Sequence, residues 1–578
     1  MKVFTTLTTL VSLLSVLAAP AHVVLSDGDL DERAITITVA APAGTIVGVR
    51  SPTTDDFNGI PFASPPVGNL RLRPPQRLTT TFNNFDATSP APACPQFLAD
   101  RDSLDLPAPI VAALADSPFF QKALKISEDC LNLNVVRPKG TKAGDNLPVL
   151  FWIYGGGFEF GWNSMYYAAP LVTNSVLKGK PYVFVAVNYR LAAWGWMPGK
   201  EVLADGASNL GLRDQRMALE WVADNIAAFG GDPSKVTIWG ESAGSVSVFS
   251  QMAAYGGNIL YKGKPLFRGG IMDSGSIIPA DPVDCAKGQA VYDAVVAKAG
   301  CTGPDSLSCL RQLPLDQFTE AANSVPSIMS WNSVALSYLP RPDNDFMPES
   351  THKLLQKGKY AAVPMIIGDQ EDEGTLFSMF QKNVTGSTAG IVKYLKDLYF
   401  TRATEQALTE FVETYPDSPF EGSPFRTGPL ELYKGFKRLA AILGDAVFTI
   451  TRRIFLTIAK SLNPTVPAWS YISSYGYGTP ILGTFHASDV LQVFFGLLPN
   501  KAAIDIQSYY SNFVYNLDPN DYSGGTGDLS RVVDYWPQWE TGTKKLIQFY
   551  RFFFSPLVDD FRTDSEKVLL ANVENFLF

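Results

Sequence analysis

Short, unbroken apolar runs constrain the fold of this chain more than any other feature of its sequence. Five of them have the length of a strand, at Val149–Ile153, Val183–Val187, Val236–Trp239, Gly269–Met272 and Pro364–Ile367. Runs without alternating polar residues are typical of parallel strands that are buried on both faces. Helical stretches at Arg213–Ala227 and Ser242–Ala254 lie between some of the runs. The pattern predicts an α/β fold with a large, mostly parallel mixed sheet covered by helices.

The two ends of the chain are expected to join this sheet in different ways. β-Branched runs at Ile35–Val39 and Ile46–Val49 predict two further strands. The residues after about Gly390 are richer in helical stretches and aromatic side chains, and we expect them to pack over the same sheet. Because no linker, repeat or charge block interrupts the chain, residues 22–578 are predicted to form a single domain.

The composition is that of a globular protein with a large core. Hydrophobic residues make up 46% of the 578 positions and charged residues only 18%, which is too low for a disordered chain. The 47 basic and 56 acidic residues include no basic stripe of the kind that follows a phosphate backbone. Nucleic acid is therefore excluded as an expected partner, and the pattern carries no prediction of the oligomeric state.

The first 18 residues have the layout of a secretory signal peptide. Lys2 precedes an apolar run that reaches Leu17, and small residues follow at Ala18, Ala19 and Ala21. Threonine and serine interrupt the run, so it falls short of the roughly 20 continuous apolar residues of a membrane span. We expect cleavage after Ala18, or as late as Ala21, and a secreted, extracellular protein without stable membrane insertion.

Five cysteines are present, so at least one must stay outside any intramolecular disulfide. Five cysteines admit several pairings. Cys301 and Cys309 bracket a short loop that a bridge could close easily, and Cys94 and Cys130 bracket a longer one. We expect these two pairs to form in an exported protein and Cys285 to remain a free thiol.

A serine lies between two glycines at the end of a predicted strand. The run Val236–Trp239 leads into Gly240, Glu241, Ser242, Ala243 and Gly244, and a helix is predicted to follow at once. A serine hydroxyl can attack a substrate only if it projects from a tight turn, and glycines two positions away let the neighbouring backbone approach. Ser242 is therefore the candidate nucleophile.

The segment Phe229–Gly244 resembles the active-serine signature of type-B carboxylesterases and lipases. The block Glu128–Val135 resembles the second signature of that family, although Asn132 stands where an aromatic residue or threonine is more usual. The resemblance runs from about Pro61 to Trp539 and is greatest with secreted fungal long-chain lipases and sterol esterases. It implies an α/β-hydrolase fold and a serine carboxylic ester hydrolase.

A nucleophilic serine needs a base, and the chain contains only three histidines. His22 lies beside the expected cleavage site, and His352 lies in a polar stretch where a solvated surface histidine is expected. His486 lies in an apolar, glycine-marked loop late in the chain, as the order serine, acid, histidine requires. We therefore predict that His486 is the general base.

Position alone does not identify the acid that orients the histidine. Asp369, Glu371, Asp372 and Glu373 all follow the run Pro364–Ile367. By resemblance the acid is Glu373, because the family commonly has a glutamate directly before a glycine at this point. Asp369 and Asp372 are then expected to be loop-capping or solvated carboxylates.

Three consecutive glycines follow the apolar run that ends near Tyr154. They occupy the place of the glycine-rich loop whose N–H groups stabilise the oxyanion in lipases and esterases. By resemblance the donors are Gly156, Gly157 and Ala243, the residue after the nucleophile. No cofactor or metal is expected, because the sequence contains no zinc-type spacing of histidine and cysteine.

The loop between Cys94 and Cys130 is predicted to hold two short helices, one beginning at Pro107 and one capped by Ser117. Its apolar residues, which include Ile110, Val111, Leu114, Phe119 and Phe120, and its closure by cysteines resemble the lid of fungal lipases. This favours a lipase or sterol esterase acting on hydrophobic long-chain esters. The lid alternative is a packed surface helix pair. The functional alternatives are a carboxylesterase for aryl, feruloyl or short-chain esters and a hydrolase-like binding protein without activity.

Asn383 is the one glycosylation sequon.

Overall fold

The structure is a computed structural model of the chain. It describes residues 35–97, 125–495, 500–520 and 534–578, together with residues 106, 107, 110, 114 and 123. The predicted signal peptide and most of the predicted lid therefore lie outside the described residues.

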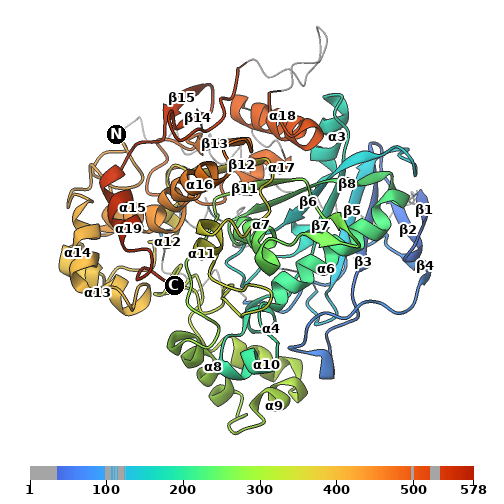
Figure 1. Cartoon of the computed structure of the whole chain (residues 1–578), viewed down its shortest axis with the longest axis horizontal. Helices are drawn as coiled ribbons and strands as arrows, with labels where there is room; N and C mark the ends of the chain where they lie inside the picture. The colour runs from blue at the N-terminus through green and yellow to red at the C-terminus, as the bar shows by residue number, and fades with distance from the viewer. Residues whose placement is uncertain are drawn as a thin grey trace, which may run out of the picture.

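One large mixed sheet runs through the molecule (Figure 1). Within the described ranges its strand order is β1-β2-β3-β5-β7-β6-β8-β11-β12-β13-β14-β15, with β4 paired to β2. The seven strands from β7 to β14 are parallel to one another, and the strands at either end are mostly antiparallel. The carboxyl ends of the parallel strands therefore meet at a single edge, where α/β sheets bind their ligands.

The strands agree with the apolar runs of the sequence where those runs are continuous. They are β1 Thr36–Ala41, β2 Gly44–Arg50, β3 Thr54–Pro61, β4 Phe82–Asp86, β5 Asn132–Pro138, β6 Leu147–Ile153, β7 Val183–Val187, β8 Gly231–Glu241, β11 Gly269–Asp273, β12 Met365–Gln370, β13 Ala468–Ser473, β14 Lys545–Phe549 and β15 Phe554–Val558. β7 and β11 are buried at every position, as expected for strands covered on both faces.

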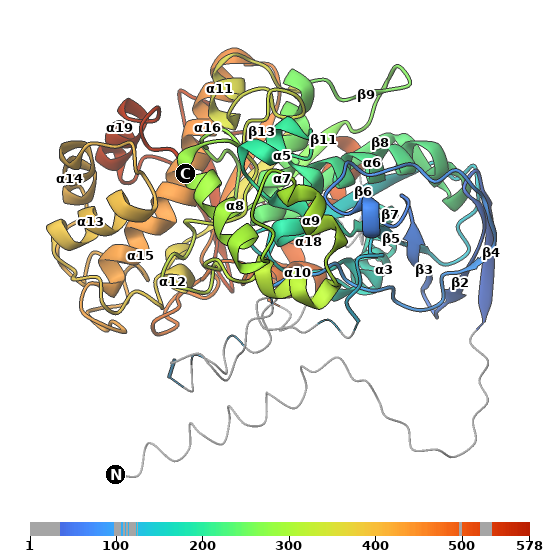
Figure 2. The same ribbon diagram turned by 90° about the horizontal axis from the view of Figure 1, so that it is seen from below.

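Helices cover both faces of the sheet. The principal ones are α3 Ala169–Leu177, α6 Leu210–Asn225, α7 Ala243–Ala253, α8 Ala286–Lys298, α9 Ser306–Gln312, α10 Leu315–Ala322, α11 Thr351–Gln356, α12 Gly374–Phe377, α13 Thr388–Leu398, α14 Glu405–Glu413, α15 Phe436–Gly444, α16 Ile450–Leu462, α17 Val490–Phe495, α18 Lys501–Asn516 and α19 Thr563–Ala571. One face carries α6, α7, α11 and α16, and the other carries α3, α17 and α18. Figure 2 shows α13, α14, α15 and α19 gathered at the end of the molecule opposite β2, β3 and β4.

The C-terminal part of the chain departs from the prediction in one respect. It was expected only to pack over the sheet, but it also contributes β13, β14 and β15 to it. The run Ala468–Ser473 mixes serine with aromatic residues, yet it is buried at every position and lies between β12 and β14 in the sheet. A short mixed run of this kind is ambiguous until its neighbours are known.

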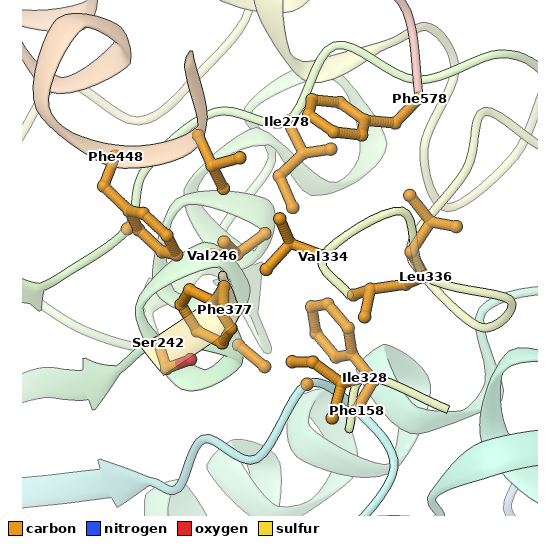
Figure 3. A pocket seen from close by; sticks show the side chains of 15 residues that line it. Phe158, Ser242, Val246, Ile278, Ile328, Val334, Leu336, Phe377, Phe448 and Phe578 are labelled. Atoms are coloured by element: carbon orange, nitrogen blue, oxygen red, sulfur yellow. The ribbon is translucent and has the colours of Figure 1, made fainter. Parts of the chain in front are cut away.

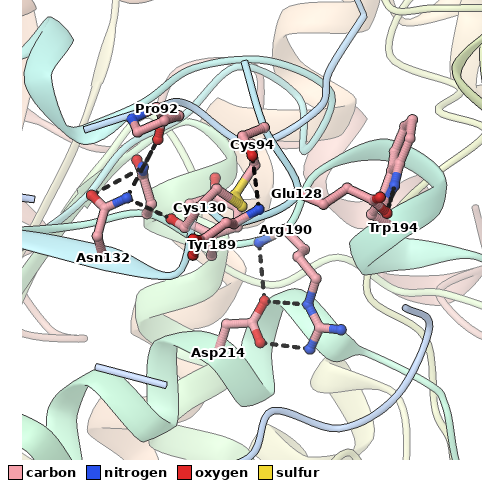
Figure 4. The surroundings of a disulfide bond; sticks show 12 residues. Pro92, Cys94, Glu128, Cys130, Asn132, Tyr189, Arg190, Trp194 and Asp214 are labelled. Carbon is pink, nitrogen blue, oxygen red and sulfur yellow. Dashed lines mark hydrogen bonds and ion pairs between the residues drawn. A yellow bond between two sulfur atoms is a disulfide. The ribbon is translucent and has the colours of Figure 1, made fainter. Parts of the chain in front are cut away.

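Two disulfides form, Cys94–Cys130 and Cys301–Cys309, and Cys285 is free. The base of the loop closed by Cys94 and Cys130 is firmly held (Figure 4). Glu128 accepts hydrogen bonds from Arg71, at 2.5 and 2.7 Å, and from Trp194 Nε1, at 3.0 Å. The predicted end of the loop at Cys130 therefore lies next to a residue, Glu128, that is held by three hydrogen bonds.

Asn132, which departs from the family pattern, begins β5 and is buried. Its Oδ1 accepts a hydrogen bond from Asn163 Nδ2 at 2.9 Å, and its Nδ2 donates to the carbonyl oxygen of Cys130 at 3.0 Å. Both ends of the amide are hydrogen-bonded, so the unusual residue leaves no buried polar group without a partner. In the part of the chain that the structure describes, no helix is both long and apolar enough to cross a membrane.

Candidate active site

Ser242 lies in a sharp turn between β8 and α7. Its backbone has φ 58° and ψ −124°, a conformation that costs a residue with a side chain about 1–3 kcal/mol. The turn is closed by tight backbone contacts that only glycine permits. A Cβ atom at Gly244 would lie 2.0 Å from the carbonyl oxygen of Ile153, and one at Gly240 would lie 2.3 Å from Gly244. These contacts are the physical reason for the two glycines around the serine.

His486 and Glu373 reach Ser242 from two other strands. Ser242 Oγ lies 2.7 Å from His486 Nε2, and His486 Nδ1 lies 2.5 Å from Glu373 Oε2. The other carboxyl oxygen of Glu373 accepts a hydrogen bond from the N–H of Gln370 at 2.7 Å. The serine follows β8, the glutamate follows β12 and the histidine follows β13, so the three predicted residues meet at the carboxyl edge of the sheet.

Burial changes the protonation of this pair. It lowers the pKa of His486 to about 3, so the imidazole stays neutral and Nε2 can accept a proton. It raises the pKa of Glu373 to about 8, and hydrogen bonds from Ser274 and from the Gln370 N–H oppose that shift only in part. A neutral base next to the serine is the state that proton removal requires.

Three further side chains contact the histidine. The rings of Phe377 and Phe448 lie 4.8 and 4.7 Å from the imidazole centre. Glu241 Oε1 lies 3.4 Å from His486 Nε2. Burial, reinforced by Asp489 and Glu373, raises the pKa of Glu241 well above its ordinary value, so this neighbour is held neutral. None of these three roles was predicted, because each depends on a contact distant in sequence.

Loop capping or solvation was expected of Asp369 and Asp372, and solvation is wrong for both. Asp369 is buried and pairs with Arg452 Nε at 2.8 Å. Asp372 is also buried, and it accepts hydrogen bonds at 2.9 Å from the N–H groups of Phe425 and Thr484 and from Ser423 Oγ. Asp372 therefore holds the loop that carries His486, which agrees with loop capping but not with solvation.

His352 is not the solvated surface residue that its polar neighbours indicated. It is buried, with Nδ1 2.8 Å from Ser350 Oγ and Nε2 3.5 Å from Glu574. Burial lowers its pKa. It lies on α11, which packs on α7 and α16, so a residue that local polarity placed in solvent belongs to a helix held inside the fold.

The predicted oxyanion residues lie around the serine. Gly157 and Ala243 line the same cavity as Ser242, whereas Gly156 lines an adjoining one. Gly156 has φ 94° and Gly157 has φ 61°, and a Cβ atom at Gly156 would lie 2.1 Å from the carbonyl oxygen of Phe160. Ala243 is the first residue of α7, where the backbone N–H has no partner within the helix.

An apolar cavity opens beside Ser242 (Figure 3). Its volume is about 500 Å³, including the part open to solvent. Its side-chain walls come from Phe158, Val246, Ile278, Ile328, Val334, Leu336, Leu339, Phe377, Val447, Phe448 and Phe578. Among the described residues that line it, Ser242 is the one with a polar side chain. The cavity therefore fits an apolar group better than a polar one.

A π-helical turn supplies part of this wall. Residues Asp445–Thr449 form the turn between α15 and α16, and it carries Val447 and Phe448. Such turns occur frequently at functional sites. Asp445 is held by Arg562 and by the hydroxyl of Tyr415, at 2.9 Å. No local sequence signal identifies a π-turn, so the sequence did not predict this wall.

Two remaining predictions concern positions away from the serine. Asn383 is exposed, as a glycosylated asparagine must be. Cys285 caps α8, with its Sγ accepting the N–H of Gly288 at 3.2 Å. Within the ranges that the structure describes, no group of three or more histidine, cysteine, aspartate or glutamate side chains is arranged to hold a metal ion.

Comparison with known proteins gives a consistent result. A model of the carboxylesterase family matches residues 35–555. The chain is 55% identical over 547 residues to the secreted triacylglycerol lipase LIP1 of Gibberella zeae, covering 94% of this chain and 91% of that protein. It is 52% identical to secreted lipase 1 of Botryotinia fuckeliana, with 97% of each chain covered. The crystal structure of Aspergillus niger EstA matches with a TM-score of 0.77 at 26% identity, covering 93% of this chain and 99% of that one.

Proposed function

Since this chain belongs to the carboxylesterase family and is a secreted ester hydrolase, we propose that it cleaves esters of hydrophobic long-chain acids through an acyl-enzyme on Ser242. The observation that carries the proposal is the short contact between Ser242 Oγ and His486 Nε2 at the wall of an apolar cavity. The family resemblance read from the sequence is confirmed by the match over residues 35–555.

In the first half of the reaction His486 acts as the general base. Ser242 Oγ attacks the ester carbonyl carbon while its proton passes to Nε2. Glu373 accepts the Nδ1–H bond, which keeps the imidazole in the tautomer that leaves Nε2 free. The imidazolium then gives its proton to the departing alcohol oxygen, and the acyl group stays on Ser242.

In the second half a water molecule takes the place of the alcohol. His486 removes its proton as it attacks the acyl carbon, and the imidazolium then gives that proton to Ser242 Oγ as the bond to the released acid breaks. The negative oxygen that forms in both halves accepts hydrogen bonds from the N–H groups of Gly156, Gly157 and Ala243. Donors held in place in advance stabilise such an oxygen by about 3–4 kcal/mol each.

The cavity supports a long acyl chain over an aryl or feruloyl group. A feruloyl ring carries a phenolic hydroxyl that needs a hydrogen-bond partner when it is buried. The described lining offers no polar side chain for it besides Ser242 itself. Relatives named as secreted lipases, one of them a triacylglycerol lipase, support the same choice. We extend that substrate class to this chain.

A substrate panel tests the proposal. The purified protein is assayed with p-nitrophenyl butyrate, caprylate and palmitate, with methyl ferulate, with a sterol ester and with an emulsified triacylglycerol. We expect kcat/KM to favour the longer acyl chains over butyrate and methyl ferulate. A preference for methyl ferulate or butyrate would instead support the carboxylesterase alternative. Failure of an organophosphate probe to label Ser242 would support the inactive binding protein.

The lid remains part of the proposal. Phe119 and Phe120, the aromatic pair on which it depends, lie outside the described residues. Ile110 and Leu114, which lie one helical turn apart, are both helical and buried. An apolar face turned toward the protein agrees with a closed lid and equally with a packed helix pair, so the two alternatives need an experiment.

A further inference from the structure

We propose that Phe578 closes the far end of the apolar cavity and sets the upper limit on acyl chain length. The inference rests on the function proposed above, because it assumes that the acyl chain lies in this cavity. Phe578 is 336 positions from Ser242 in the sequence, yet both residues line the same space. Figure 3 shows them on opposite sides of it, with Ile278 beside the Phe578 ring.

The end at which Phe578 lies is the closed one. Only 5% of Phe578 is exposed, and the buried rings of Phe400 and Tyr399 lie behind its ring, so protein closes the cavity at this end. The described base of the Cys94–Cys130 loop meets the cavity on the other side. There the N–H of Phe97 donates to the carbonyl oxygen of Glu159, and Glu159 Oε2 accepts the N–H of Ile328 at 2.9 Å. Figure 3 shows Ile328 and Phe158 on the side away from Phe578.

The backbone of Phe578 is held on both sides. Its N–H donates to the carbonyl oxygen of Pro279 at 2.9 Å. Its main-chain oxygen accepts from Arg341 Nη1 at 3.0 Å and from the N–H of Asp281 at 3.3 Å. Arg341 is buried, and the same Nη1 donates to the carbonyl oxygen of Asp281 at 3.1 Å. The residue is thus fixed to the segment that carries Ile278.

The ring of Phe578 is packed from behind as well. The Phe400 ring lies 5.3 Å away with its plane at 66°, and the Tyr399 ring lies 6.1 Å away at 65°. Both neighbours are buried. A ring fixed at the backbone and supported by two aromatic side chains cannot move aside for a longer chain without loss of these contacts. An acyl chain that reaches this wall must therefore stop or bend.

The change that tests this is Phe578→Ala, with Phe578→Trp as its opposite. Removing the ring lengthens the cavity, and one methylene of pocket space changes kcat/KM by about tenfold or more. We expect Phe578→Ala to raise the ratio of kcat/KM for long to short acyl esters by about tenfold, with the butyrate value changed less than about twofold. Phe578→Trp should lower the same ratio.

Phe576 provides a matched control. Its ring is also buried and stacks on the same Phe400 ring, with centroids 4.8 Å apart, but it does not line the cavity. Phe576→Ala should therefore lower Tm as Phe578→Ala does and leave the chain-length profile unchanged. If Phe578→Ala fails to fold, Phe578→Leu and Phe578→Trp still report opposite shifts in the profile.

The outcomes separate this inference from the function on which it rests. If the Phe578 variants affect all chain lengths equally, or have no effect in folded protein, the inference about Phe578 is overturned and the proposed function is not. If the wild-type protein shows no preference for apolar esters, or if Ser242→Ala retains turnover, the proposed function is overturned instead. The same shift in Phe576→Ala would assign the effect to general loosening of the core.

Discussion

The ring of Phe448 packs against the imidazole of His486, with the two centres 4.7 Å apart and the planes at 43°. The same phenyl ring lines the apolar cavity next to Ser242. One side chain therefore touches both the proposed base and the space proposed for the substrate. It comes from the π-turn Asp445–Thr449, and Phe377, stacked on it at 5.7 Å, contacts the histidine as well.

Replacing Phe448 by alanine should hydrate the histidine and enlarge the cavity together. Because burial is the main cause of the lowered pKa of His486, water at this position should raise that pKa. We expect a fall in kcat of roughly tenfold, since proton transfer depends on the position and protonation of the base. NMR titration of the imidazole and steady-state kinetics measure the two effects. An unchanged titration with unchanged kcat would show that the ring is only a wall.

The three proposed catalytic residues predict a steep order of effects. Ser242→Ala and His486→Ala should each leave less than about one hundredth of the normal turnover in folded protein, because loss of either partner disables attack. Glu373→Gln should also be severe. Asp372→Asn should retain most activity but lose about 1–3 kcal/mol of stability, since its carboxylate accepts two backbone N–H groups. The reverse order for Glu373 and Asp372 would move the acid to Asp372.

The pH dependence of kcat/KM should follow Glu373 rather than the histidine. Burial keeps the proton on Glu373 up to a pKa of about 8 and removes it from His486 down to about 3. The ionised glutamate stabilises the imidazolium that forms when His486 takes the proton of Ser242, so activity should rise as pH increases toward 8. Rates measured with a dissolved short-chain ester between about pH 5 and pH 9, a range that brackets the Glu373 pKa, test this. If kcat/KM stays constant from about pH 6.5, the ordinary pKa of histidine, up to pH 9, the prediction is wrong.

Glu159 should make the fold less stable as pH rises. It is fully buried on the glycine-rich loop, and burial raises its pKa to about 8. The unfolded chain loses this proton near the ordinary value of 4.5 while the folded chain keeps it, so stability is complete below 4.5 and falls toward pH 8. The slope is roughly 1.4 kcal/mol per pH unit. Glu159→Gln should flatten it in denaturant unfolding, whereas an unchanged slope would show that another group is responsible.

The loop between Cys94 and Cys130 should govern access if it is a lid. Replacing Phe119 and Phe120 by serine should reduce hydrolysis of emulsified long-chain esters far more than that of dissolved short-chain esters, because an apolar lid gains its open form by contact with lipid. The expectation rests on the sequence, since both residues lie outside the described ones. Parallel losses on the two substrates would make the loop structural. No loss on either would favour an open carboxylesterase site.

Much of the site could be read from short stretches of sequence. The turn at Ser242 was predicted because tight glycine contacts leave a local pattern, and the runs at Val183–Val187 and Gly269–Met272 proved to be strands because burial on both faces leaves an unbroken apolar run. β13 could not be recognised, since the hydroxyl of its Ser470 is satisfied by Arg452, 18 positions away in the sequence, rather than by an adjacent residue.

The amino-acid sequence by itself determined the family, and it predicted the three residues that can act together and two of the several cysteine pairings that were open. The tertiary structure alone decided which groups surround them. His352 and Asp369 are polar in polar stretches, yet both are buried, His352 beside Glu574 and Asp369 against Arg452 of α16. Phe448 and Phe578 line a cavity with Ser242 through contacts that span more than 200 residues. Covalent neighbours carry local geometry, whereas burial and the pKa shifts it causes depend on contacts between distant segments.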